Sequence, residues 1–66
     1  MNITKKQIEK LSPQTIVYSI KKRGSKINNY IGFIVTYAVK LNNTTITTKK
    51  TIELDYQDTI HYFSNN

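Results

Sequence analysis

The chain has 66 residues, enough for a single small domain over 1–66, and its ten Lys and Arg against four Asp and Glu give a formal net charge of +6. It contains no cysteine, which excludes disulfides, thiol nucleophiles and cysteine zinc sites. No apolar run approaches the roughly 20 residues that span a bilayer, and no signal-peptide pattern follows the basic N-terminus. We therefore expect a cytoplasmic basic protein that does not bind membranes.

The charge is divided unevenly along the chain. Residues 1–50 hold all ten basic residues and one acid, Glu9, whereas residues 51–66 hold three acids and no base. Nine of the ten basic residues are lysine, which is typical of a low-GC genome, so codon usage accounts for part of the charge. The uneven layout nevertheless favours an oriented surface that meets a polyanion.

The first element in chain order is a short helix. Thr4 is placed as its N-cap, and Gln7 follows three residues later to complete a capping box. We expect the helix to end at Ser12-Pro13, because the residue before a proline is pushed out of the helical conformation.

Two strand patterns follow the helix. Residues 15–20 are mostly β-branched or aromatic and predict a strand, and residues 21–26 predict a basic, glycine-containing turn. Residues 30–41 predict a second strand whose alternate positions form one apolar face: Ile31, Phe33, Val35, Tyr37, Val39 and Leu41. Pairing Ile16 with Ile31, and Ile20 with Ile27, keeps the apolar side chains together and places Tyr18 on the same face.

A third strand returns from the second. Asn42-Asn43 predicts a two-residue hairpin turn, because asparagine tolerates the left-handed conformation, and residues 44–54 then form the return strand. This register places Ile52 opposite Phe33 and, as a misfit, Lys50 opposite Val35.

The last predicted element is a helix over residues 55–63. Asp55 is placed as its N-cap, and Tyr56, Ile60 and Phe63 recur at the spacing that covers an apolar sheet face. The predicted fold class is therefore α+β: a three-stranded antiparallel β-meander flanked by a short N-terminal and a short C-terminal helix, in the order α-β-β-β-α.

An alternative is open for residues 13–22. Ser12-Pro13 is also a good helix start, with serine at the N-cap and proline at the first helical position. A helix there would give a winged helix-turn-helix with Tyr18 and Lys22 facing a DNA groove.

The candidate nucleic-acid-binding residues lie in the basic turn and on the polar face of the sheet. Several lysines near one another can contact successive phosphates, and an aromatic ring on the same face can stack on unpaired bases. The predicted site consists of Lys21, Lys22, Arg23, Lys26, Tyr30, Lys40 and Lys49. Tyr30 is the one tyrosine that the predicted register places for stacking.

The sequence predicts no catalytic site, no cofactor and no metal site. Asp58 and His61 lie three residues apart on the predicted helix, but their spacing matches no metal-ligand motif and no nucleophile accompanies them. We therefore do not expect an enzyme.

The predicted element order resembles that of two known families. The order is similar to that of the double-stranded-RNA-binding domain, but this chain begins its second helix with the acidic Asp55-Tyr56-Gln57-Asp58, where that family has lysines. It is also similar to that of small mRNA interferase toxins, but Gly24-Ser25-Lys26 stands where they have Gly-Ser-His. The binding and cleavage residues do not carry over, and no family is assigned.

The predicted function is a small basic nucleic-acid-binding module, with DNA favoured over RNA and single-stranded and duplex DNA both open. It would serve as an accessory subunit of a replication or recombination enzyme of a phage or mobile element, with a larger protein as partner. The alternative is a protein-binding inhibitor of the anti-defence type that docks on a host nuclease. A homodimer through the exposed third strand is a further expectation.

Overall fold

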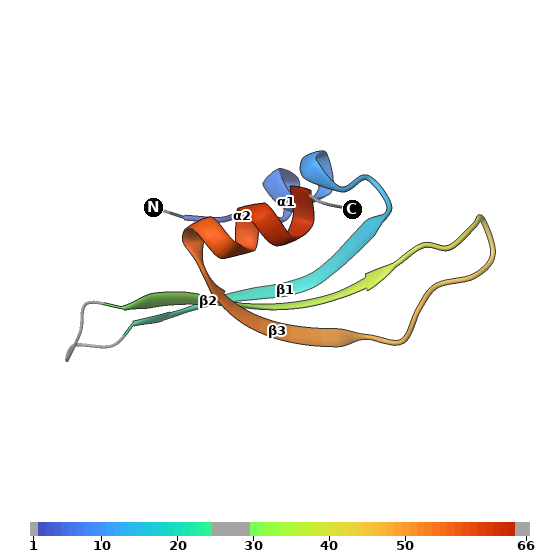
Figure 1. Cartoon of the computed structure of the whole chain (residues 1–66). Coiled ribbons are helices and arrows are strands. Elements are labelled where there is room, and N and C mark those ends of the chain that lie inside the picture. The colour runs from blue at the N-terminus through green and yellow to red at the C-terminus, as the bar shows by residue number, and fades with distance from the viewer. Residues whose placement is uncertain (1, 25–29, 65–66) are drawn as a thin grey trace.

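The computed structural model describes residues 2–24 and 30–64. Its elements, in chain order, are α1 (Lys5–Leu11), β1 (Thr15–Gly24), β2 (Ile31–Val39), β3 (Lys50–Asp55) and α2 (Tyr56–Ser64). The strands form one antiparallel sheet in the order β1-β2-β3, which confirms the predicted α-β-β-β-α fold. Both helices lie on the same face of this sheet (Figure 1). Neither of them is long and apolar enough to cross a bilayer.

Residues 15–24 form a strand, so the winged helix-turn-helix alternative is wrong. Thr15, Ile16 and Val17 are β-branched and lose side-chain freedom in a helix, whereas they fit the pleated surface of a sheet. All three pair with β2. Pairing with β2 therefore determines the secondary structure of this segment, although Ser12-Pro13 is also a good helix start.

Local capping begins both helices as predicted. The Thr4 hydroxyl accepts from the Gln7 amide at 3.3 Å, and the Gln7 side chain accepts from the Thr4 amide at 2.8 Å. The Asp55 carboxylate accepts from the Asp58 amide at 2.7 Å at the start of α2. Each cap satisfies N–H groups that have no partner inside a helix.

The first hairpin pairs differently from the prediction. Ile20 pairs with Val35 and Gly24 with Ile31, so the predicted pairings of Ile20 with Ile27 and of Ile16 with Ile31 are both wrong. The basic segment 21–24 continues β1 instead of forming a turn, because its backbone bonds continue along β2 as far as Ile31. The remainder of the predicted turn, and the Ile27 partner proposed for Ile20, lie outside the described residues.

A β-bulge at Tyr18 interrupts the alternation of β1. Val17 pairs with Tyr37 and Ser19 pairs with Thr36, so the register skips Tyr18. Val17 and Ile20 consequently share the helix-covered face, although strict alternation would separate them. The prediction that Tyr18 lies on the apolar face is wrong, because the bulge shifts the alternation by one residue.

The second hairpin is shifted by two residues from the predicted register. Val35 pairs with Ile52, Phe33 with Leu54, and Lys50 with Tyr37. A shift of two leaves every side chain on its predicted face, and it removes the misfit of Lys50 opposite Val35.

The longer loop explains this shift. The Asn42 side chain accepts from the amides of Thr44 and Thr45, each at 2.9 Å, and forms a side-chain-stabilised turn. The Thr47 amide then donates to the Val39 carbonyl at 2.9 Å. Because this loop takes up residues 40–49, β3 begins at Lys50 and the two-residue turn is wrong.

The core lies between the two helices and the middle of β2. Its buried residues are Ile3, Ile8, Val17, Phe33, Val35, Tyr37 and Phe63. Phe63 is fully buried, and its ring meets that of Tyr37 edge-to-face with 5.2 Å between centroids. Ile31 and Leu41, predicted for the same apolar face, are exposed. Ile31 is the first residue of β2 and Leu41 follows its end, and both ends of β2 extend beyond the helices (Figure 1).

Tyr37 combines burial with a polar contact. Its side chain is 2% exposed, and its hydroxyl forms a hydrogen bond with the hydroxyl of Tyr62. Burial, assisted by the hydrogen bond and the charge of Tyr62, raises the pKa of Tyr37 from 10.0 to about 12. The neutral phenol is therefore the form that the fold stabilises.

We expect Phe63→Ala to unfold the domain. Removing a buried phenylalanine costs about 3–5 kcal/mol, and a core this small supplies roughly 3–5 kcal/mol in all. Urea denaturation followed by circular dichroism measures the loss. Ile46→Ala, at a residue that is 50% exposed, is the control and should change stability by less than about 0.5 kcal/mol. An unchanged midpoint for Phe63→Ala would contradict the packing of α2 on the sheet.

We expect the free energy of unfolding to decrease between pH 10 and about 12. The pKa of Tyr37 is about 12 in the folded state and near 10.0 in the unfolded chain, so the folded state retains a proton that the unfolded state loses. This contribution is complete below pH 10 and is lost as the pH rises through the folded pKa. Urea denaturation on either side of pH 10 should show a shallower pH dependence for Tyr37→Phe than for the wild type or the exposed-site control Tyr18→Phe.

Candidate nucleic-acid interface

The sheet face opposite the helices is the candidate site, and we call it the open face. Residues directly opposite in antiparallel strands share a face, so the register assigns its members. From the three strands these are Ile16, Ser19, Lys21, Arg23, Gly32, Ile34, Thr36, Ala38, Thr51, Glu53 and Asp55, of which Asp55 also caps α2. Contacts described below add Tyr18, Tyr30 and Lys49. The open face therefore combines basic, acidic, aromatic and hydroxyl side chains.

Tyr18 and Lys49 meet at one end of the open face. The Lys49 ammonium lies 4.5 Å from the centroid of the Tyr18 ring, a cation–π contact. Tyr18 belongs to β1 and Lys49 precedes β3, so the contact spans β2. The contact crosses β2 on the open face, which Ala38 shares. The side chain of Ala38 is small and fully buried, whereas the bulky side chain of Tyr37 lies on the helix-covered face. The bulge thus exposes Tyr18, which is 40% accessible, on the open face.

Tyr30 occupies the other end of the open face. A Cβ atom on Gly32 would lie 2.7 Å from the Tyr30 hydroxyl oxygen and 2.8 Å from a ring carbon. The ring therefore lies over the backbone of Gly32, in space that any larger residue would fill. Tyr30 is 37% accessible in this position. Tyr30, the predicted stacking residue, is consequently on the predicted face, and the missing side chain of Gly32 leaves space for its ring.

One predicted cation lies between the tyrosines, and a second lies beside Tyr30. Lys21 is exposed and pairs with Ile34 at the centre of β2. Arg23 pairs with Gly32 in the register, and its guanidinium lies 3.3 Å from the Glu53 carboxylate of β3. This exposed ion pair contributes little to stability, but it reduces the positive charge beside Tyr30.

The structure separates Lys22 from this group. Lys22 pairs with Phe33, so its side chain starts on the helix-covered face, where its ammonium lies 3.4 Å from the Asn2 side-chain oxygen. Lys40 is exposed just beyond β2 and forms an isolated bridge with Ile46. Lys26 lies outside the described residues. Because 21–24 is a strand, alternate basic side chains point to opposite faces, and the predicted cluster divides.

Sequence reasoning missed two members of the open face. Tyr18 was assigned to the core, because a β-bulge changes the facing of a residue without any local signal in residues 15–20. Glu53 was counted with an acidic C-terminal segment, yet the sheet returns it to the side of Arg23. The error for Tyr18 concerns the face that it occupies, whereas the error for Glu53 concerns its partner, because the predicted register already placed residue 53 on the polar face.

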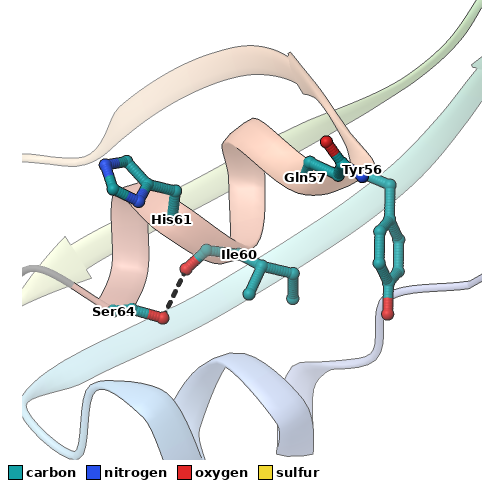
Figure 2. A pocket seen from close by; sticks show the side chains of 5 residues that line it. All are labelled: Tyr56, Gln57, Ile60, His61 and Ser64. Carbon is teal, nitrogen blue, oxygen red and sulfur yellow. Dashed lines mark hydrogen bonds between the residues drawn. The ribbon is translucent and has the colours of Figure 1, made fainter.

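A separate open hollow of about 380 Å³ lies along α2, lined by Tyr56, Gln57, Ile60, His61 and Ser64. Figure 2 shows Tyr56 and Ile60 pointing toward the side of α1 and His61 pointing away from it. The Ser64 hydroxyl donates to the Ile60 carbonyl at 2.6 Å, as the dashed line marks. Within residues 2–24 and 30–64, His, Cys, Asp and Glu side chains do not gather in threes to hold a metal ion.

Comparisons with protein-family models, with curated proteins and with solved structures find no match to this chain. The open face is therefore the feature of this protein that bears on its function.

Proposed function

We propose that this protein binds nucleic acid through the open face, with DNA as the first ligand to test. One observation supports the proposal most directly. The sheet face opposite both helices presents Lys21, Arg23 and Lys49 together with two partly exposed tyrosines, Tyr18 and Tyr30.

The two kinds of side chain suit the two parts of a nucleic acid. Lysine and arginine neutralise phosphates and release counterions, which supplies affinity that depends strongly on salt. Tyrosine rings stack on bases of any sequence. The hydroxyls of Thr36 and Thr51, which lie 3.2 Å apart, are further groups suited to phosphate or sugar contacts.

Two of the acidic side chains make contacts within the domain. Glu53 contacts Arg23, and the Asp55 carboxylate accepts the Asp58 amide at the start of α2. The inhibitor alternative would use these carboxylates to fill a basic channel on another protein. Their present contacts favour the nucleic-acid proposal, whereas the inhibitor and the accessory-subunit role stay predictions.

We expect charge reversal on the open face to abolish most binding. In Lys21→Glu/Lys49→Glu, loss of two phosphate contacts should weaken binding at least about tenfold and reduce the salt slope by roughly 2. Fluorescence anisotropy of a labelled DNA oligonucleotide at two salt concentrations measures both quantities.

The matched control for this double variant is Lys5→Glu/Lys22→Glu. It makes the same change in net charge, but Lys5 lies in α1 and Lys22 starts on the helix-covered face. We expect a loss of less than about threefold from long-range electrostatics. Equal losses in the two double variants would contradict a site on the open face, and absence of binding to DNA by the wild type at low salt would refute the proposed function.

We expect Glu53→Gln to strengthen binding. The substitution removes a carboxylate 3.3 Å from the Arg23 guanidinium and leaves that cation available to a phosphate. The gain should be about three- to tenfold at low salt and should shrink as salt screens the charges. Glu9→Gln in α1 makes the same charge change away from the open face. A similar gain in both variants would show that net charge, and not the Arg23 contact, sets the affinity.

A further inference from the structure

Two departures from a regular sheet place the aromatic rings of the open face. The β-bulge in β1 exposes Tyr18 on the open face, and Gly32 leaves the space that the Tyr30 ring occupies. Bulges and strand glycines both weaken a regular sheet. Here both features serve to present a partly exposed tyrosine ring. Lys21 and Ile34 lie between these rings in the register.

We propose that the open face binds single-stranded nucleic acid, with one unpaired base stacked on Tyr18 and another on Tyr30. Lys21 would contact the intervening phosphates, and the Lys49 ammonium would move from the Tyr18 ring to a phosphate. This inference rests on the proposed function and specifies the ligand of the same site.

The spacing of the rings supports separate bases. Tyr30 lies over Gly32, whereas Tyr18 adjoins Ser19, which pairs with Thr36. Four residues along a strand cover about 13 Å at roughly 3.3 Å each. Stacked bases repeat at about 3.4 Å, so the rings cannot enclose one base between them. A strand that reaches both rings must pass over Ile34, beside Lys21.

The shape of the site favours an unpaired strand over a duplex. Reading a duplex requires an element that enters a groove, usually a helix or a two-stranded ribbon standing out from the surface. Most residues of the open face belong to strands lying side by side, Tyr30 and Lys49 directly precede strands, and the Tyr30 ring lies over the backbone of Gly32. Bases already stacked inside a duplex cannot reach such rings, whereas unpaired bases can.

Lys49 links the two kinds of contact. In the free protein its ammonium lies on the Tyr18 ring, where an exposed cation–π contact is weak. A phosphate offers that ammonium a stronger partner. The same movement uncovers the ring, so binding of the backbone and stacking of the base on Tyr18 support each other.

The test compares three labelled ligands of equal phosphate count on the wild-type protein: an oligothymidine, a matched oligomer of abasic units and a duplex. We expect oligothymidine to bind at least about tenfold more tightly than the abasic oligomer, because stacking adds to the charge contacts. Fluorescence anisotropy at low salt measures all three affinities, and the wild-type comparison requires no variant to fold.

Variants then assign the effect to the two rings. Tyr18→Leu/Tyr30→Leu should lower the affinity for oligothymidine about tenfold, to that for the abasic oligomer, and leave abasic binding unchanged. Tyr18→Phe/Tyr30→Phe keeps the rings and should retain wild-type binding. Circular dichroism of each double variant confirms that it is folded.

The outcomes separate this inference from the proposed function. Equal affinity for oligothymidine and the abasic oligomer would contradict base stacking but not nucleic-acid binding. Tighter binding to the duplex than to oligothymidine would likewise contradict the inference and leave the proposed function standing. Unchanged oligothymidine binding by the leucine variant would overturn the assignment to Tyr18 and Tyr30. If the wild type binds none of the three ligands at low salt, both the inference and the proposed function are wrong.

Discussion

The burial of one sheet face under two short helices is the constraint on which the rest of this structure depends. Phe33, Val35 and Tyr37 alternate along β2 and fill the space beneath α2 and α1. Because a strand alternates its side chains, this burial sends Gly32, Ile34 and Thr36 to the opposite side. A chain of 66 residues has two helices for cover, and the structure places both on the same face. The open face follows directly from the core.

The open face then acquires its chemistry from the way β1 and β3 pair with β2. The bulge lets Val17 and Ile20 both serve the core while Tyr18 is exposed on the other side. The small residues Gly32 and Ala38 leave room on the open face for the Tyr30 ring and for the contact between Tyr18 and Lys49. Aromatic and basic groups from three segments thereby meet on one surface, and the proposed binding of single-stranded nucleic acid depends on this combination.

Charge is organised differently in space than along the chain. In the sequence, all ten basic residues lie in residues 1–50, and three of the four acidic residues lie in residues 51–66. The return of β3 brings Glu53 to Arg23, so the opposed halves meet on the open face. Alternation in β1 meanwhile divides neighbouring Lys21 and Lys22 between the two faces. The basic segment thus contributes to the site through alternate residues and not as a cluster.

The sequence by itself determined the features that depend on interactions between residues close together in the chain. The caps at Thr4 and Asp55, the alternation of β2 and the element order follow from interactions within a few residues, and they were predicted correctly. Register depends on partners far away in the chain. The side-chain turn at Asn42 shifted β3 by two residues, and the bulge at Tyr18 exchanged the faces of β1. Sequence reasoning placed Lys21, Tyr30 and Lys49 on the polar face, where the structure also has them. The facing of Tyr18 and Lys22, and the contact of Glu53 with Arg23, were decided by tertiary pairing, because a one-residue change in register sends a side chain to the opposite face.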